Sequence, residues 1–306
     1  MLTSFAQRGP DSSLQSSAQR TPHDLRDPSR GRDPFLTVMV RVGLIGCGTI
    51  GSRIALALQQ RYHRVARITA LHDSNPSHAR QLQQQLTPRP MVVSLASLIR
   101  NNQLVIEAAS VDIAGHVVRQ SLLAHRSVFV MSVGGLLIDQ AWRRVVRRSR
   151  GRVYIPSGAL AGLDGVKAMA VGRIQRLSLT TRKPPKAFAS APYIRRKGLQ
   201  LSRLAKALVV FEGSPAEVVR AFPQNTNVAA ALMLAGGDSG KPVRVRVIAD
   251  PTIRANIHAL EVHGDSGRIS CTVESRPSSN PKTSELAIRS AIAMLGRFFD
   301  SVVIGT

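Results

Sequence analysis

The first half of the chain alternates two hydrophobic patterns from residue 40 onward. Short apolar runs, typical of buried strands, are followed by segments in which apolar residues recur every three or four positions, as on one face of a helix. The runs predict strands at residues 40–45, 67–72, 92–93, 104–108, 127–131 and 152–155. The periodic segments predict helices at residues 52–60, 76–86, 95–99, 112–125 and 138–148. This alternation predicts an α/β fold built on a doubly wound parallel sheet, the Rossmann arrangement.

The pattern changes after residue 156. Alternating apolar and polar positions predict strands at residues 174–182, 207–211, 243–249, 256–263 and 268–274, with few helices between them. A mixed or antiparallel sheet of this kind indicates a second, α+β domain. A long amphipathic segment at residues 284–298 predicts a C-terminal helix that returns to pack on the first domain. We therefore expect a Rossmann domain over residues 39–160, an α+β domain over 161–280 and a returning helix within 281–299.

Residues 1–38 have a different composition. They are rich in Ser, Pro, Asp and Arg and carry little apolar periodicity, which predicts a disordered leader. The segment has no apolar signal-peptide core, and its four aspartates argue against a transit peptide. Met39 directly precedes the first strand and is a candidate for the true start, while the purpose of the leader is left open.

A glycine-rich loop follows the first predicted strand. Gly46-Cys47-Gly48-Thr49-Ile50-Gly51 has the spacing G-x-G-x-x-G, and Asp73 ends the second strand 22 residues after Gly51. Gly46 permits the tight turn, Gly48 lets a pyrophosphate approach the backbone, and Gly51 lets the helix pack on the strand. We predict a dinucleotide site at Gly46, Gly48, Thr49, Ile50, Gly51 and Asp73. The alternative is a glycine-rich turn with Asp73 capping the next helix.

The acid also bears on which dinucleotide binds. Asp73 would accept hydrogen bonds from the ribose and repel a 2′-phosphate, which favours NAD, while the nearby Arg53 and Arg80 leave NADP open.

Composition narrows the function classes. The two cysteines, Cys47 and Cys271, give no disulfide framework and no metal-ligand spacing, so we expect a cytoplasmic protein without a metal site. No apolar run approaches the roughly 18 residues of a membrane span. The net charge of +24 is spread along the chain and is densest at Arg143, Arg144, Arg147, Arg148 and Arg150. Because aromatic residues make up only 4% of the chain, we interpret this cluster as a solvated basic face and expect no specific nucleic-acid partner.

Three loops fall at the carboxyl ends of predicted strands, where ligands bind in open α/β sheets. They cover residues 107–110, 132–135 and 156–164. Ala109 lies in the first loop, and Ala159 and Ala161 lie in the third. Small side chains there would let a nicotinamide and its substrate approach the backbone. A close helix–strand crossing would require the same small residues.

Polar side chains of the second half supply the remaining candidates. His258 shares one face of a predicted strand with Asn256, and an imidazole among apolar neighbours can transfer protons near neutral pH. Its alternative is a structural histidine. Asn227 could hydrogen-bond a carboxamide or ribose, or cap the helix that follows it. Two further segments, at Arg182 and at Lys282 with Thr283, place a cation beside hydroxyl groups. Such a group could bind a carboxylate of the substrate. The alternative is an ordinary turn with surface charge.

Several motifs together resemble one family, L-aspartate dehydrogenase. The matching stretches, in order from Val40 to the C-terminus, are residues 46–51, 107–110, 131–134, 156–159, 181–185, 222–229, 250–258 and 280–284. The glycine loop alone is shared by many dehydrogenases, whereas the later motifs in combination are specific. The leader and the arginine richness depart from the family pattern.

The resemblance implies a Rossmann domain, a C-terminal catalytic and dimerisation domain, and a homodimer. The implied reaction is NAD(P)-dependent oxidative deamination of L-aspartate to iminoaspartate, which hydrolyses to oxaloacetate and ammonia and feeds NAD synthesis. His258 matches the catalytic histidine, and Asn227 matches a cofactor contact, as does either Ala159 or Ala161. Arg182, Asn256, Lys282 and Thr283 are the candidates for contacts with the substrate.

Two alternative functions remain open at this point. One is another two-domain NAD(P) oxidoreductase, of the homoserine dehydrogenase or dihydrodipicolinate reductase type. The other is a non-catalytic NAD-sensing regulator, which would bind the cofactor without turnover.

Overall fold

The computed structural model describes residues 39–189, 191–223, 227–237, 243–276, 278 and 284–305. The expected leader, residues 1–38, and the candidate residues Lys282 and Thr283 lie outside the described residues. Val38–Thr306 forms one compact unit, and the description below concerns this unit.

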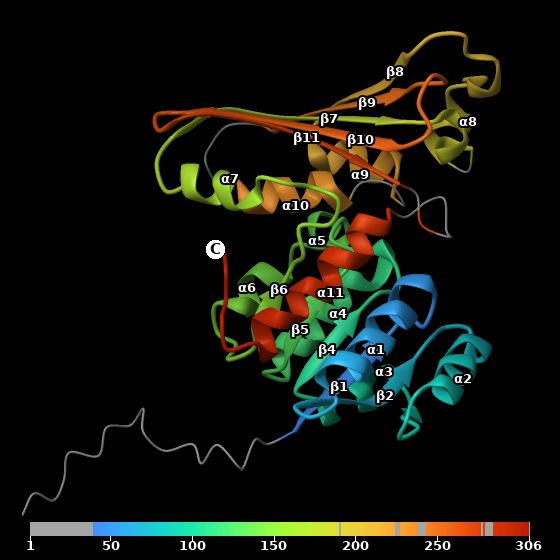
Figure 1. The fold of residues 1–306 in the computed structure, drawn as a ribbon, viewed down its shortest axis with the longest axis vertical. Coiled ribbons are helices and arrows are strands. Elements are labelled where there is room, and N and C mark those ends of the chain that lie inside the picture. The colour runs from blue at the N-terminus through green and yellow to red at the C-terminus, as the bar shows by residue number, and fades with distance from the viewer. Residues whose placement is uncertain are drawn as a thin grey trace, which may run out of the picture. The chain divides into compact units, whose positions relative to one another are not determined.

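The first sheet has six parallel strands in the order β3-β2-β1-β4-β5-β6 (Figure 1). The strands are β1 (Val40–Ile45), β2 (Ala66–His72), β3 (Met91–Val92), β4 (Leu104–Glu107), β5 (Ser127–Val130) and β6 (Val153–Tyr154). The chain order reverses between β1 and β4, which creates the crevice where nucleotides bind in doubly wound sheets. This arrangement confirms the predicted Rossmann fold.

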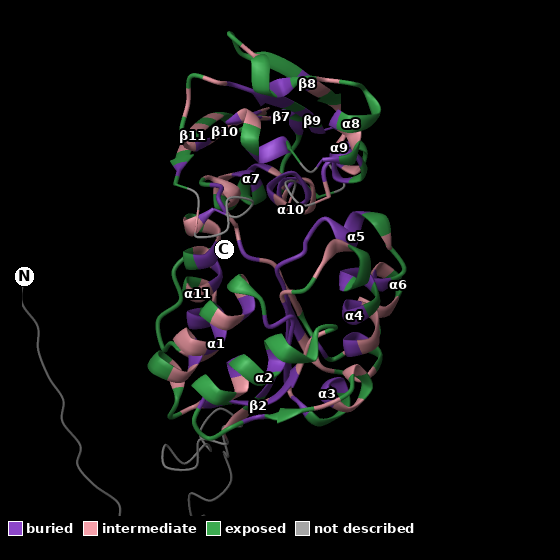
Figure 2. Ribbon diagram, turned by 90° about the vertical axis from the view of Figure 1, so that its right-hand side faces the viewer, coloured by how far each residue is buried: buried purple, intermediate pink, exposed green. Residues whose placement is uncertain are grey.

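Helices cover both faces of this sheet because its strands are apolar on both sides, and the central strands are buried (Figure 2). One face packs against α1 (Thr49–Tyr62), α2 (Pro76–Gln85) and α11 (Glu285–Phe299). The other packs against α3 (Leu95–Asn101), α4 (Val111–Leu123) and α5 (Gly135–Ile138), with α6 (Trp142–Val146) beyond them.

The helix expected at residues 138–148 is interrupted near its start, because α5 ends at Ile138 and α6 covers only Trp142–Val146. Asp139 between them has an extended backbone, with φ −100° and ψ 103°. Its carboxylate accepts a hydrogen bond from the Ala141 N–H at 3.0 Å, so the side chain competes with helical bonding and interrupts the helix.

The second sheet is mixed, with five strands in the order β11-β10-β7-β9-β8. The strands are β7 (Ile174–Lys183), β8 (Leu208–Gly213), β9 (Val243–Ala249), β10 (Asn256–Gly264) and β11 (Gly267–Ser275). Only the β7–β9 pair is parallel among the pairings of these strands. Helices α7 (Leu163–Met169), α9 (Pro215–Ala221) and α10 (Asn227–Ala235) share one hydrophobic core with it. The sheet and its helices confirm the expected α+β half.

Three shorter elements were not expected from the sequence. They are the 3-10 helices η1 (Pro185–Phe188) and η2 (Leu201–Arg203) and the helix α8 (Pro192–Arg196). The helix α9 was not expected either. It begins at a capping box in which Ser214 and Glu217 satisfy each other's backbone N–H groups.

The C-terminal helix α11 returns to the first sheet, as expected. Leu295 is fully buried in the core that α1 and the first sheet share. The Tyr62 and Phe299 rings lie 5.0 Å apart, and the Tyr154 and Phe298 rings lie 4.1 Å apart. Over the described residues, α11 and the other helices are too short or too polar to traverse a bilayer.

Candidate functional site

The glycine loop joins β1 to the N-terminus of α1. Gly46 has a φ of +88°, and a Cβ there would lie 2.5 Å from the Ala108 backbone. A Cβ on Gly51 would collide with the Gly46 carbonyl oxygen. In contrast, apart from its own chain neighbours, no atom of the described residues lies within 4 Å of the Cβ position of Gly48. Gly46 and Gly51 therefore shape the turn, and the backbone at Gly48 is open.

The open backbone lies at the end of a 14-residue helix whose first residues are Thr49 and Ile50. The N-terminus of a helix carries unsatisfied N–H groups and a partial positive charge, which suit a phosphate. The loop thus fits the pyrophosphate of a dinucleotide.

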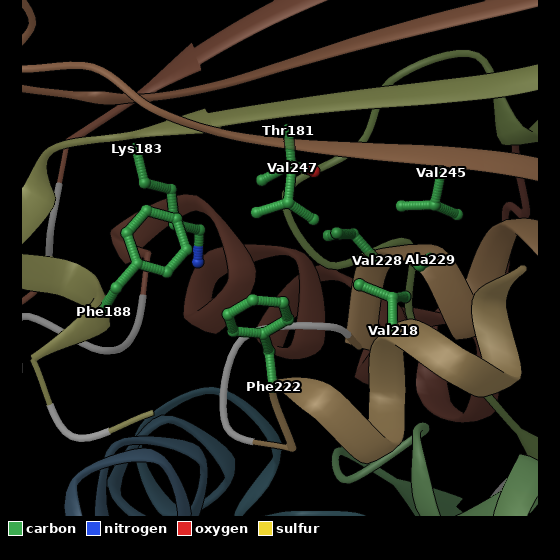
Figure 3. Close-up of a pocket in the computed structure, with 9 residues that line it drawn as sticks. All are labelled: Thr181, Lys183, Phe188, Val218, Phe222, Val228, Ala229, Val245 and Val247. Carbon is green, nitrogen blue, oxygen red and sulfur yellow. The ribbon is translucent and has the colours of Figure 1, made fainter. Parts of the chain in front are cut away.

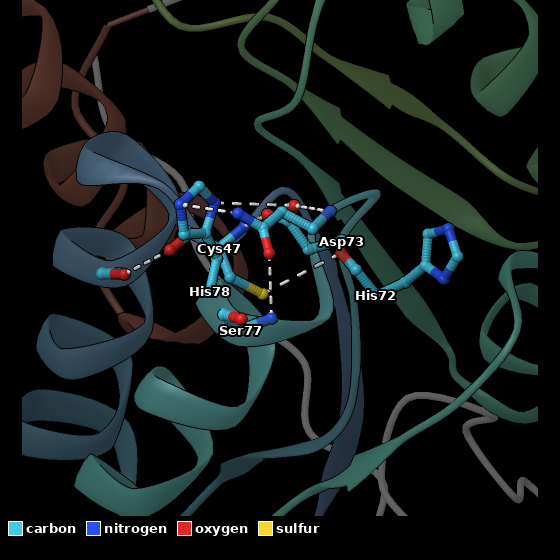
Figure 4. Close-up of polar contacts among 7 residues, drawn as sticks. Cys47, His72, Asp73, Ser77 and His78 are labelled. Carbon is cyan, nitrogen blue, oxygen red and sulfur yellow. Dashed lines mark hydrogen bonds and ion pairs between the residues drawn. The ribbon is translucent and has the colours of Figure 1, made fainter.

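Asp73 is bonded to this loop across the ends of two strands (Figure 4). Its Oδ2 accepts the Cys47 N–H at 2.7 Å, and its Oδ1 accepts the Asn75 N–H at 2.8 Å. The His78 Nδ1 lies 3.7 Å from the same Oδ1. These contacts fix the carboxylate beside the glycine loop, where an adenosine ribose would lie in a Rossmann site.

Cys47 is buried inside the loop. Burial, followed by the charge of Asp73, raises the pKa of its thiol to about 12. The thiol is therefore protonated at neutral pH and acts as a small packing group rather than a nucleophile.

Glu107 joins the loops that follow β4 and β5. Its fully buried carboxyl accepts the Ala109 N–H at 2.8 Å and the Ser132 N–H at 3.0 Å. Burial raises the pKa of this carboxyl, while the backbone N–H groups act in the opposite direction. Ala109 is therefore held at the switch point of the sheet. Both loops were predicted from the sequence as ligand-binding positions, but the role of Glu107 in joining them was not.

Asn227 connects the second half to the nucleotide-binding edge. It is the first residue of α10, and its Oδ1 accepts the Gly134 N–H of the loop after β5 at 3.1 Å. Ala159 is buried in the core of the second sheet, whereas Ala161 is exposed and lines an open pocket bordered by β6, α7, α10 and α11. Which alanine contacts the cofactor therefore stays a prediction.

His258 lies on β10 opposite Thr181 of β7. Its side chain points to the buried face of the sheet and is 3% exposed. Its Nδ1 lies 3.0 Å from the Thr181 Oγ1 in a hydrogen bond, which leaves Nε2 to face a reactant. Burial, followed by the charge of Lys183, lowers the pKa of the imidazole to about 3. The ring is therefore neutral at physiological pH.

Lys183 lies on the same buried face, two residues beyond Thr181 (Figure 3). It lines a pocket with Thr181 and otherwise apolar or aromatic side chains, namely Phe188, Val218, Phe222, Val228, Ala229, Val245 and Val247. Burial lowers the pKa of its ammonium to about 8. Residues two positions apart on a strand share a face, so the pattern of β7 contained the signal that places Lys183 beside Thr181.

Arg182 lies on the opposite face of β7 from Lys183. Its Nη1 is 3.0 Å from the buried Asp250 Oδ2, and its side chain is 43% exposed. Hydrogen bonds from Thr252, followed by the charge of Arg182, lower the pKa of Asp250. The structure thus brings Thr181, Lys183 and His258 to one face, with the buried Asn256 on the same strand face as His258, and places Arg182 elsewhere.

Comparisons with known proteins cover both halves of this arrangement. The family model for the C-terminal region of aspartate dehydrogenase matches residues 164–298, and a model for the NAD-binding domain of homoserine dehydrogenase matches residues 46–153. L-aspartate dehydrogenase of Methanosarcina barkeri is 41% identical to this chain, over 88% of this chain and 100% of the relative. The chain belongs to the L-aspartate dehydrogenase family.

Other members of the L-aspartate dehydrogenase family agree with this assignment. The enzyme of Bradyrhizobium diazoefficiens is 35% identical over 87% of this chain and 94% of its own length. The crystal structure of aspartate dehydrogenase from Thermotoga maritima has the same fold, with a TM-score of 0.67 and 24% identity over 87% of this chain and 99% of the other. The expected family, enzyme class and use of NAD(P) are therefore confirmed.

The family assignment joins two sets of residues. The first lies at the carboxyl edge of the first sheet, where the open backbone at Gly48 fits the phosphates of an NAD(P) cofactor. The second offers a neutral imidazole, a hydroxyl and an ammonium on the inner face of the second sheet. The contact between Asn227 and Gly134 links the two, since Val228, the next residue, lines the Lys183 pocket.

Proposed function

We propose that this protein oxidises L-aspartate to iminoaspartate with NAD⁺, and that the imine then hydrolyses to oxaloacetate and ammonia. The observation that carries the proposal is the buried His258, whose Nδ1 is fixed by Thr181 on the face that adjoins α10. Burial keeps this imidazole neutral at physiological pH, so an unprotonated ring nitrogen is present to accept a proton. The relatives named L-aspartate dehydrogenase support the substrate.

Each group has a defined part in the proposed mechanism. Gly46, Gly48, Thr49, Ile50 and Gly51 hold the cofactor phosphates, Asp73 receives the ribose hydroxyls, and Ala109, Asn227 and one of Ala159 or Ala161 border the nicotinamide. NAD⁺ supplies the acceptor for the hydride that leaves the substrate Cα. His258 Nε2 takes the proton from the substrate ammonium, so that the nitrogen lone pair can form the C=N bond. His258 then releases this proton to water, and its Nε2, neutral again, accepts a proton from the water that attacks the imine carbon; transfer of that proton to the amine nitrogen lets ammonia leave.

The finer properties are also proposals. We propose that NAD is preferred over NADP, because Asp73 is held beside the glycine loop and Arg53 is engaged with Glu285 at 3.0 Å. We further propose a cytoplasmic homodimer that supplies iminoaspartate to NAD synthesis. A dimer is supported by the edge strand β8 of the second sheet, which exposes Leu208 and Val209.

The proposal is tested by NAD(P)H formation from purified enzyme with L-aspartate, D-aspartate, L-glutamate and L-homoserine, each with NAD⁺ and NADP⁺. L-aspartate with NAD⁺ should give the highest kcat/KM. Faster turnover of L-homoserine would assign the other oxidoreductase class. Tight NAD⁺ binding without turnover of any substrate would instead indicate a regulator.

A further inference from the structure

The Glu107 carboxyl group lies between the two loops at the reacting end of the proposed cofactor site. We propose that Glu107 is a positioning residue for hydride transfer, because its carboxyl group holds the loops after β4 and β5 in the arrangement that brings the cofactor and the substrate together. The inference rests on the proposed function, because it concerns the geometry of that same reaction.

Hydrogen bonds tie the Glu107 carboxyl group to both loops. One oxygen accepts the Ala109 N–H at 2.8 Å in the loop after β4. The other accepts the Ser132 N–H at 3.0 Å in the loop after β5. Because each oxygen serves a different loop, neither loop can move relative to the other without breaking one of these bonds.

The burial of Glu107 explains why a carboxyl group is required at this position. The side chain is fully buried, so water cannot replace a lost partner. A carboxylate accepts at both oxygens, whereas a glutamine amide accepts at one and presents an NH₂ group to the other donor. Burial raises the pKa of the Glu107 carboxyl, and the N–H groups of Ser132 and Ala109 lower it. These N–H groups therefore favour the charged form that can hold both loops.

The loop after β5 extends this arrangement to the second half of the molecule. Two residues beyond Ser132, the Gly134 N–H donates to the Asn227 Oδ1 at 3.1 Å, and Asn227 begins α10. A Cβ on Gly134 would lie 3.1 Å from the Val219 side chain of α9, so the loop also packs closely against this helix. Both helices share a hydrophobic core with the second sheet, which carries His258. The loop therefore helps to set the position of His258 relative to the first sheet.

The expected effect of Glu107 is on the rate of reaction rather than on affinity for the whole cofactor. The phosphates and the adenosine ribose are assigned to residues 46–51 and to Asp73, whereas Glu107 contacts the loops after β4 and β5. Hydride transfer requires the reacting atoms to be closely aligned, and a displacement of about 1 Å can slow a reaction roughly 100-fold. Loss of the Glu107 contacts should therefore slow hydride transfer and leave the ADP-ribose part of the cofactor bound.

The test compares Glu107→Gln with Asp112→Asn, the same acid-to-amide change at an exposed position in the first turn of α4. The measurements are NADH formation in a single turnover of NAD⁺-loaded enzyme with L-aspartate, and the calorimetric dissociation constant of ADP-ribose. Glu107→Gln should slow NADH formation by about 10- to 100-fold, with the dissociation constant of ADP-ribose within about twofold of the wild type. Asp112→Asn should change neither quantity by more than about twofold.

A second variant, Glu107→Asp, separates the geometry from the charge. It keeps the carboxylate but is one methylene shorter, so it can bond the nearby Ala109 N–H without reaching Ser132. It should slow NADH formation by at least about tenfold with ADP-ribose affinity unchanged, and it decides the matter if Glu107→Gln does not fold. In either variant the reaction should be slower again with L-aspartate deuterated at Cα, because hydride transfer is then the slow step.

Several results would overturn the inference. They are a single-turnover rate within about threefold of the wild type in either folded Glu107 variant, a slowed rate that does not respond to deuterium, or an equal loss in Asp112→Asn. A loss of ADP-ribose affinity as large as the loss of rate would also overturn it, since Glu107 would then be structural.

The wild-type assay separates this failure from that of the proposed function. If the wild type does not reduce NAD⁺ with L-aspartate, the proposed function fails. An active wild type with unaffected Glu107 variants removes only the role of Glu107.

Discussion

Proton transfer in the proposed reaction depends on a single side chain, His258. Thr181 occupies its Nδ1, and burial keeps the ring neutral, so Nε2 is the nitrogen available to the substrate amine. Replacing His258 by Ala should lower kcat by roughly 10²- to 10⁴-fold, because the proton acceptor is lost. Steady-state kinetics and NAD⁺ titration measure this, and the dissociation constant of NAD⁺ should stay within about twofold. Loss of NAD⁺ binding in the variant would mean that His258 is structural.

Cofactor choice is also decided at the residue scale. Asp73→Ser should raise the ratio of kcat/KM for NADP⁺ to that for NAD⁺ at least about tenfold, since the acid that repels a 2′-phosphate is removed. The serine hydroxyl can still accept a hydrogen bond. The control is Asp112→Ser, an exposed acid in the first turn of α4. An unchanged ratio in Asp73→Ser, or an equal change in Asp112→Ser, would contradict this role.

The sequence predicted some of these residues better than others. Gly46, Gly51 and Asp73 were predictable because a tight turn and a ribose contact impose spacing along the chain. The choice between Arg182 and Lys183 was not, because adjacent strand residues point to opposite faces and both are cationic. Only burial shows which face is inside, and it places Lys183 there.

At the scale of elements, α11 ties the end of the chain to the first sheet. Leu295 is fully buried there, whereas Leu286, on the same helix, is 38% exposed. Leu295→Ala should lower the free energy of unfolding by about 2–5 kcal/mol, because it leaves a cavity against α1. Leu286→Ala should change it by less than about 1 kcal/mol. Urea denaturation measures both, and equal losses would show that α11 does not pack through Leu295.

The elements that could be predicted were those with a clear hydrophobic pattern, either repeated over several turns of a helix or continuous along a strand. The segment expected at residues 284–298 is α11, and the runs expected at residues 40–45 and 243–249 are β1 and β9. The five-residue helix α8 and the seven-residue helix α9 were missed, because so few turns give no clear period. The break between α5 and α6 was also missed, since it depends on one hydrogen bond, which the Asp139 carboxylate accepts from the Ala141 N–H.

For the whole molecule, His258 and Lys183 make folding stability depend on pH. His258 has a pKa of about 3 when folded and about 6.5 when unfolded, so the unfolded chain binds the proton more tightly. Above about pH 6.5 His258 therefore has no effect on the free energy of unfolding. As the pH falls from 6.5 toward 3, the free energy of unfolding decreases. Lys183 has a pKa of about 8 when folded and about 10.5 when unfolded. The free energy of unfolding therefore rises with pH between about pH 8 and pH 10.5.

This linkage predicts a measurable difference between variants. From pH 7 to pH 5 the wild type should lose about 2 kcal/mol more of its unfolding free energy than His258→Gln, which cannot take up the proton. Urea denaturation at the two pH values measures the loss, with the exposed His63→Gln as the control. If His258→Gln and the wild type lose the same amount, the buried imidazole is not excluded from protonation.

The central claim is that the Cα hydrogen of L-aspartate passes to NAD⁺ in this enzyme. The most direct measurement uses L-aspartate deuterated at Cα and examines the reduced nicotinamide by mass spectrometry and NMR. One deuterium per NADH at the nicotinamide C4, together with oxaloacetate and ammonia in equal amounts, is the predicted result. NADH that carries no deuterium, or no NADH from L-aspartate at all, would contradict the account.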